Sequence, residues 1–196
     1  MKKSTITIVA ILAVVALAVF WGVKAYNSLI VLDENVNNRW AYVESQYQRR
    51  ADLIPNLVAT VQGYAKHERE TFESVVAARA KATQITVDAD NLTPEKLQEF
   101  QKAQGEVSAA LGRLLAVAEN YPELKANQNF LELQAELAGT ENRISVERNR
   151  FNEAAKEYNV EVRRFPQNLF ASMFGFAQKP YFEAEAGTQA APKVSF

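Results

Sequence analysis

Arg49 and Arg50, followed by Asp52, are the residues whose types and spacing offer the most chemistry in this chain. Two guanidinium groups at a helix end could hold a phosphate or a carboxylate through charge-assisted hydrogen bonds. The same residues also have a structural interpretation, because arginines in a last helical turn complement the helix dipole and an aspartate caps the next helix. The structural interpretation is favoured, since no nucleophile or metal centre accompanies the pair.

The other reactive side chains do not form a recognisable catalytic or metal-binding set. The chain has one histidine, His67, and no cysteine. It therefore cannot supply a thiolate nucleophile, a cysteine zinc site or a site needing two imidazoles. Tyr64 stands where a di-iron helix would carry a glutamate before its histidine. The sequence also has no glycine-rich phosphate loop. We expect no catalytic residue, metal, cofactor or small-molecule substrate, and hence no enzyme.

Length and charge limit the remaining classes of protein. The chain has 196 residues, enough for one domain and short for two. Its 22 basic and 23 acidic side chains nearly cancel. Nucleic-acid binding is normally accompanied by a basic excess, so we expect no nucleic-acid partner.

An uncharged stretch near the N-terminus predicts a transmembrane helix at residues 5–24, after a short basic tail at 1–4. Residues 6–23 carry no charge and would rise about 27 Å as a helix, just enough for the hydrocarbon layer. A cleaved signal peptide is the alternative, but the apolar run continues past its candidate cleavage site at Ala18. Lys2 and Lys3 favour a cytoplasmic N-terminus and a body on the periplasmic or outer side.

The rest of the chain, to residue 165, has the pattern of antiparallel helices. The predicted helices cover about 25–51, 53–86, 94–120 and 122–164, with Thr93 and Pro94 typical of a helix start. Pro55 leaves two possibilities, since apolar spacing of three and four continues straight across it. One kinked helix would preserve that register. A turn near Asp52 would give four helices of similar length that bury their apolar stripes better.

Apolar residues recur every seven positions in the last predicted helix and indicate a coiled-coil seam. The series is Phe130, Leu137, Ile144, Phe151, Tyr158 and Phe165. The adjoining column is polar and consists of Gln134, Glu141 and Arg148. These three are either solvated flank residues or a buried polar layer that fixes register or subunit pairing, together with Arg49 and Arg50. In the helix at 94–120, Gln104 is the one polar residue of the apolar series.

Several segments of the chain form a recognisable set: Tyr26–Val36, Arg49–Val58, Gly63–Glu68, Glu119–Asn127, Thr140–Ile144, Tyr158-Asn159, Gly175-Phe176 and Lys179–Glu183. Together they resemble the LemA family of bacterial membrane proteins. The resemblance extends from the apolar stretch to about Glu183. It implies an N-terminal transmembrane helix followed by an up-and-down four-helix bundle, which favours the turn near Asp52. It implies no catalytic activity and no cofactor.

An aromatic-rich amphipathic segment follows at residues 166–183, before a tail at 184–196 that we expect to be disordered. Its candidate membrane-interface residues are Phe165, Leu169, Phe170, Met173, Phe174 and Phe176. The segment could instead cover the open end of the bundle or form an assembly contact. Four helices would bring it beside the bilayer near Tyr26, whereas a helix continuous through Pro55 would move it about 40 Å away.

These observations predict a non-enzymatic single-pass protein of the bacterial inner membrane. Its helical bundle would self-associate and act as a scaffold or adaptor at the cell envelope. The alternative is a lipid-interface protein that organises membrane through residues 165–182. The expected partners are the lipid bilayer, further copies of the chain and another envelope protein.

Overall fold

The computed structural model describes residues 3–183, without the side chains of residues 3–5 and 90. The predicted tail at 184–196, and part of that at 1–4, lie outside these residues. The helices are α1 (Lys3–Gln62), α2 (Arg69–Gln84), α3 (Pro94–Ala118), α4 (Pro122–Lys125), α5 (Gln128–Arg163) and α6 (Gln167–Phe174), with a 3-10 turn η1 (Ala89–Asn91). No strand occurs within residues 3–183, so the all-α prediction is confirmed there.

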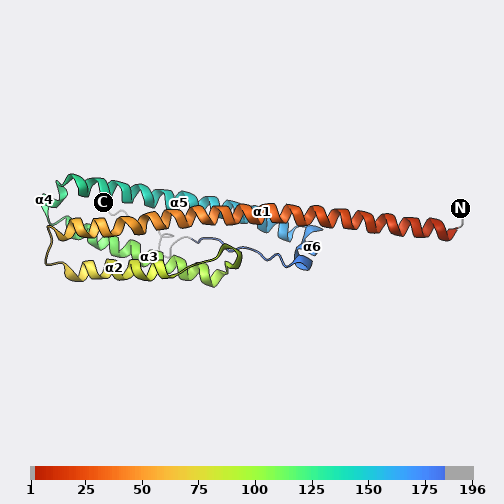
Figure 1. The fold of residues 1–196 in the computed structure, drawn as a ribbon, viewed down its shortest axis with the longest axis horizontal. Helices are drawn as coiled ribbons and strands as arrows, with labels where there is room; N and C mark the ends of the chain where they lie inside the picture. Colours follow the sequence, from red (N-terminus) through yellow and green to blue (C-terminus); the bar gives the residue numbers. More distant parts are fainter. Residues whose placement is uncertain (1–2, 184–196) are drawn as a thin grey trace, which may run out of the picture.

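Two long helices, α1 and α5, run side by side in opposite directions and form the axis of the body (Figure 1). The shorter helices α2 and α3 pack against each other and cover the half of this pair farther from the N-terminus. The chain reverses direction from α1 to α2, from α2 to α3 and again before α5. The first part of α1 projects beyond every other described helix.

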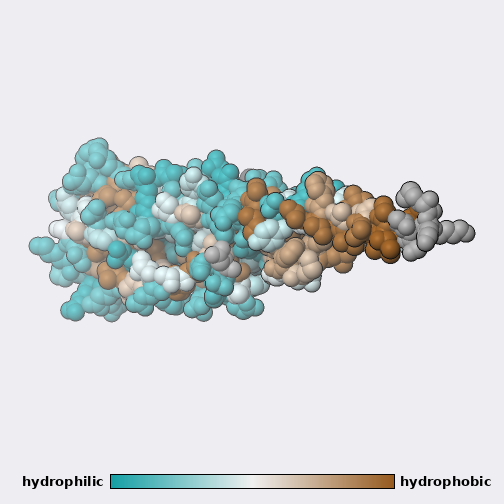
Figure 2. Space-filling view, turned by 45° about the vertical axis from the view of Figure 1, so that its right-hand side comes forward, coloured by the Kyte–Doolittle hydropathy of each residue, from teal (hydrophilic) through white to brown (hydrophobic). Residues whose placement is uncertain are grey.

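The projecting part of α1 is the apolar stretch of the sequence. Its large side chains, from Ile6 to Val23, are all more than half exposed. Figure 2 shows this apolar surface gathered at one end of a body that is otherwise mostly hydrophilic. Within the described residues, α1 is the helix long and apolar enough to cross a membrane by length and composition. A helix with such a surface needs an apolar environment around it.

The prediction of a turn near Asp52 is wrong, because α1 continues through Pro55 to Gln62. The helices predicted at 25–51 and 53–86 are replaced by α1 and α2, which are joined by the turn at residues 63–68. Beyond the proline, Leu57, Val58 and Val61 are buried in the same apolar cluster as residues of α2 and α3. A turn at residue 52 would have broken the register that buries them. The helix predicted at 122–164 is also divided, since Asn127 caps α5 after the short α4.

Arg79 of α2 explains how α1 tolerates a proline. Pro55 has no N–H, so the carbonyl four residues earlier, on Ala51, loses its helical donor. The Nε group of Arg79 donates to that oxygen at 2.7 Å. Ala51 is half-buried, and a buried carbonyl without a donor costs about 1–3 kcal/mol, so this bond offsets part of the penalty of the interruption. The partner lies 28 residues away in sequence, in a separate helix.

We expect Arg79→Ala to lower the free energy of unfolding by about 1–2 kcal/mol, because the Ala51 carbonyl loses a charged donor. In a Pro55→Ala background, the N–H of residue 55 can take over that carbonyl. The same arginine substitution should then cost about 1 kcal/mol less. Urea unfolding of the parent chain, the two single variants and the double variant measures the coupling between Arg79 and Pro55. A coupling of zero would show that Arg79 does not act through the carbonyl.

Candidate functional site

Arg50 is the most deeply buried charged side chain among the described residues, at 2% relative exposure. Its Nη1 donates to Ser108 Oγ of α3 and to Glu141 Oε1 of α5, both at 2.8 Å. Its Nη2 donates to the side-chain oxygen of Gln104 at 2.6 Å and to the backbone oxygen of Gln104 at 3.1 Å. The Tyr47 ring lies 5.1 Å from the guanidinium carbon. One side chain of α1 thus bonds two other helices.

The Arg50 layer, defined as Arg50, Gln104, Ser108 and Glu141, separates two apolar clusters. The cluster nearer the N-terminal projection contains Trp40, Phe100 and Phe151. The farther cluster contains residues on the other side of the layer, such as Ile54 and Leu137. The planar guanidinium of Arg50 bonds α3 and α5 in a fixed fork geometry. A shift of α3 or α5 along α1 would break these hydrogen bonds. The layer can therefore fix the register of three helices.

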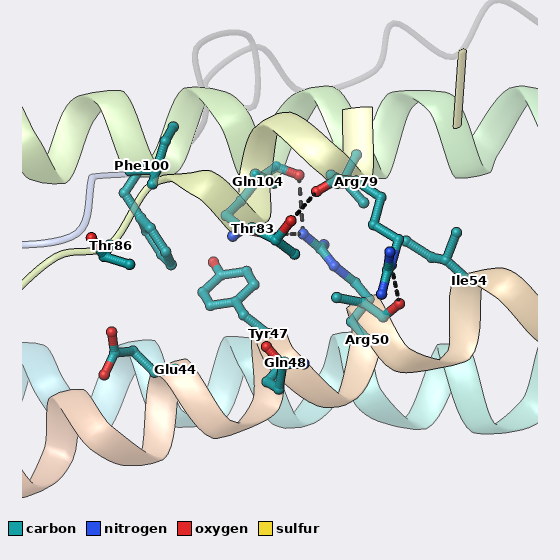
Figure 3. Close-up of a pocket in the computed structure, with 14 residues that line it drawn as sticks. Glu44, Tyr47, Gln48, Arg50, Ile54, Arg79, Thr83, Thr86, Phe100 and Gln104 are labelled. Carbon is teal, nitrogen blue, oxygen red and sulfur yellow. Dashed lines mark hydrogen bonds between the residues drawn. The ribbon is translucent and has the colours of Figure 1, made fainter. Parts of the chain in front are cut away.

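A cavity of about 150 Å³ lies beside the Arg50 layer, between α1, α2 and α3. Figure 3 shows Arg50 reaching from α1 toward Gln104 and Arg79 reaching back toward α1. Glu44 lies at the opposite side of the cavity. Burial raises the pKa of the Glu44 carboxyl, with a smaller contribution from Asp88, while a hydrogen bond from Trp40 opposes them. Both arginines bond protein groups at this cavity, Arg50 to Gln104 and Arg79 to the Ala51 carbonyl.

The other residues of the predicted polar set lie in different places. Arg49 is half exposed and pairs with Glu136 across the α1–α5 contact at 2.6 Å. Gln134, one heptad before Glu141, is half-buried. Arg148 lies one heptad after Glu141 on α5 and does not bond Arg50. Its guanidinium carbon is instead 4.9 Å from the centre of the Phe182 ring. The predicted column is therefore divided, and only Glu141 joins Arg50.

Residues 175–183, which we call the strap, run back from α6 along α5 (Figure 1). Asn159 and Asn152 of α5 hold its backbone. The amide of Asn159 donates to Lys179 O and its oxygen accepts from Lys179 N, both at 2.8 Å. Asn152 makes the same pair with the backbone of Phe182, at 3.0 and 2.8 Å. Three extended residues and seven helical residues both span about 10 Å, so the two clamps match.

Two side chains of the strap are buried in the body. Lys179 forms an ion pair with Asp33 of α1 at 2.9 Å and donates to Ala89 O at 3.2 Å. The Phe182 ring stacks on Trp40, with centroids 5.9 Å apart, and meets Phe151 edge-on at 5.4 Å. The strap thus completes the apolar cluster where α2 and α3 do not cover it.

The candidate membrane-interface residues divide between α6 and its neighbours. Phe165, Leu169, Met173 and Phe174 are exposed, whereas Phe170 and Phe176 are half-buried. The Phe174 and Phe176 rings lie 5.0 and 5.8 Å from the Tyr26 ring of α1. The segment therefore lies beside Tyr26 although α1 is continuous through Pro55. The expected displacement of about 40 Å is wrong because the chain still turns back, at residues 63–68 rather than at 52.

A groove of about 890 Å³ lies between α1 and α5, near the projecting end of α1. Its lining includes Val31 and Val160, which are 68% and 44% exposed. Its lining is Lys24, Asn27, Ser28, Val31, Leu32, Glu153, Lys156, Glu157, Val160 and Glu161. It thus combines an exposed aliphatic centre with acidic and basic side chains.

Sequence reasoning missed the two asparagine clamps and Arg79. The only signal for the clamps is that Asn152 and Asn159 lie one heptad apart beside the apolar seam. The role of Gln104 was visible as a polar interruption of an apolar series, but its partner was not. His67, the single histidine, lies exposed in the turn between α1 and α2.

Comparison with known proteins finds a family and several relatives. Residues 39–196 match the model of the LemA family. Two proteins of Paramagnetospirillum magneticum, magnetosome proteins MamQ 1 and MamQ 2, are each 27% identical over 90% of this chain and 71% of their own. Protein LemA of Metamycoplasma hominis is 23% identical over 81% of this chain and 68% of its own. None of these relatives is named as an enzyme.

Proposed function

The chain belongs to the LemA family, and we propose that it is a non-enzymatic, membrane-tethered helical scaffold that self-associates at the bacterial cell envelope. The apolar N-terminal part of α1 would span the membrane and hold the body beside it. Relatives named as magnetosome proteins fit a membrane-associated protein. The observation that carries the proposal is the exposed aliphatic groove between α1 and α5.

The use of the polar side chains supports a role without chemistry. Arg50, the residue best suited to hold an anion, has its Nη groups bonded to Gln104, Ser108 and Glu141. The buried Lys179 is paired with Asp33. Both side chains hold segments of the protein together. A scaffold needs this internal rigidity, because its partners bind a surface whose shape must persist.

The groove suits a second copy of the same chain. Two copies tethered to one membrane with the same orientation are related by an axis along the membrane normal, so residues at equal heights meet. Val31 and Val160 would then face the corresponding aliphatic centre of the neighbour. Lys156 would meet the acids of the neighbour's groove at its own height, Glu153 and Glu157, which makes the surface self-complementary. Tethering raises the effective concentration, so a modest contact is sufficient.

We expect Val31→Cys to form an intermolecular disulfide when native membranes are oxidised. The chain has no cysteine of its own, so a single introduced thiol gives an unambiguous dimer band. Gln178→Cys is the matched control, because Gln178 is exposed near Asp33 and Tyr158 but in a separate cleft on the strap side. The Val31 variant should crosslink at least about tenfold more than the control. Equal crosslinking, or none in either variant, would contradict the proposed interface.

A further inference from the structure

Helix α6 is held against α1 where the apolar stretch of α1 ends. Gly22 lies opposite the Phe170 ring, and a β-carbon at Gly22 would lie 3.1 Å from Phe170 Cε1. Gly22 therefore permits a close approach that a larger residue would disturb. One turn farther along α1, the Tyr26 ring contacts the rings of Phe174 and Phe176 edge-on. These contacts fix the height of α6 at the end of the candidate span.

The opposite side of α6 is a large apolar surface without a cover among the described residues. Phe165, Leu169 and Met173 are 76%, 60% and 66% exposed. Helix α6 itself, Gln167–Phe174, contains no charged residue. Helix α6 lies beside the end of the apolar stretch of α1, since Phe170 packs against Gly22. Aromatic side chains at such a position are typical of the membrane–water interface.

Three basic residues lie around this surface. Residues 22–27 contain Lys24, and residues 163–176 contain Arg163 and Arg164, while neither segment contains an acid. Lys24, Arg163 and Arg164 are exposed. Arg164 contacts Glu161 at 3.2 Å, but this pair is open to solvent on the arginine side and holds the arginine only weakly. Three cations thus border an apolar surface at the height where lipid headgroups would lie.

We propose that α6, with Lys24, Arg163 and Arg164, forms an interfacial site for anionic phospholipids. Phe165, Leu169 and Met173 enter the acyl boundary, and the three cations contact headgroup phosphates. This assignment rests on the proposed membrane span, which brings α6 to the bilayer. The partner is a lipid surface, because the apolar residues are continuous with α1 and the charges complement anionic headgroups. The site fixes the angle of the body relative to the membrane and makes it depend on lipid composition.

The effect of lipid charge follows from the number of cations. Each basic residue near an anionic membrane surface contributes about fivefold to binding. Replacing Arg163 and Arg164 by glutamine should therefore lower the ratio of inserted to free α6 by about twenty-fivefold in anionic membranes. In neutral membranes the same replacement should have little effect.

The test uses the full chain with a single label in vesicles. Met173→Cys carries an environment-sensitive fluorophore, and the vesicles contain phosphatidylcholine either alone or mixed with anionic phosphatidylglycerol. We expect a blue shift and quenching by spin-labelled lipid that increase with phosphatidylglycerol. The increase should disappear in the Arg163→Gln, Arg164→Gln variant. A label at Leu131→Cys, at the far end of α5, should report water in every vesicle.

Three results would overturn the lipid site. Equal quenching of the Met173 label with and without phosphatidylglycerol would exclude selectivity for anionic lipid. A Met173 label that reports water in every vesicle, as the Leu131 label should, would exclude insertion of α6. A label protected from both lipid and aqueous quenchers would show that protein covers α6. A further label at Val14→Cys reports on the membrane span separately. If lipid quenches the Val14 label but not the Met173 label, the lipid site is contradicted while the proposed span is not.

Discussion

Replacing Arg50 by alanine is expected to lower the free energy of unfolding by about 3 kcal/mol. Removing one partner of a buried ion pair typically costs about 3–5 kcal/mol, because the remaining polar groups stay desolvated. The value should lie at the low end because the side chain of Glu141 is 40% exposed and can turn to water. Gln104 and Ser108 would keep their places between the two apolar clusters without the guanidinium. Urea unfolding of the full chain in micelles, followed by circular dichroism, measures the loss.

The neighbouring Arg49 is the matched control for this prediction. Its pair with Glu136 is exposed on both sides, so Arg49→Ala should change stability by less than about 1 kcal/mol. Arg50→Lys should recover only part of the loss, since an ammonium cannot reproduce the fork that bonds Gln104, Ser108 and Glu141 together. Equal effects of Arg49→Ala and Arg50→Ala would contradict the structural role of the Arg50 layer.

Phe182→Ala should release the strap from the body. Truncating a buried phenylalanine costs about 3–5 kcal/mol, and this ring contacts Trp40, Phe151 and Arg148. The strap can open locally while the helices remain folded, so the loss should appear first as local exposure. Hydrogen exchange at the amides of Lys179 and Phe182, which Asn159 and Asn152 protect, should accelerate by at least about a hundredfold. Mass spectrometry of the peptide covering residues 175–183 measures this exchange.

Tyr181 provides the control from the adjacent position. Its side chain is 41% exposed, so Tyr181→Ala should leave exchange of the strap within about threefold of the parent chain. Exchange that is unchanged in Phe182→Ala would show that the asparagine clamps hold the strap without the ring. Global acceleration in all helices would show instead that the strap is part of one cooperative unit with the body.

The apolar patterns predicted the helices because burial follows periodicity, and the uncharged run at 6–23 predicted an exposed apolar helix for the same reason. At Pro55 the apolar register favoured a continuous helix, whereas the burial of four similar helices and the family resemblance favoured a turn. What preserves α1 is a hydrogen bond from Arg79, whose position depends on how α2 packs. No pattern within α1 contains that information.

Long-range pairing also limited the prediction of the candidate site. Gln104 and Glu141 were visible as polar positions beside apolar ones, yet their common partner is Arg50, more than 50 residues away in sequence from each. The aromatic residues after Phe165 were recognised as unusual. The division into an exposed helix and a buried strap was not, because it depends on Asn152, Asn159 and Asp33 in other parts of the chain.

Self-association through the groove between α1 and α5 can be decided by counting copies in native membrane particles. The full chain, with a fluorophore fused to its C-terminus and expressed at low level, is extracted with its surrounding lipid by an amphipathic polymer. Single-particle photobleaching then counts the chains. We predict two or more copies in most particles, and one copy for Val31→Glu, which places a charge at the aliphatic centre of the groove. One copy per particle in the parent chain would contradict the scaffold proposed here.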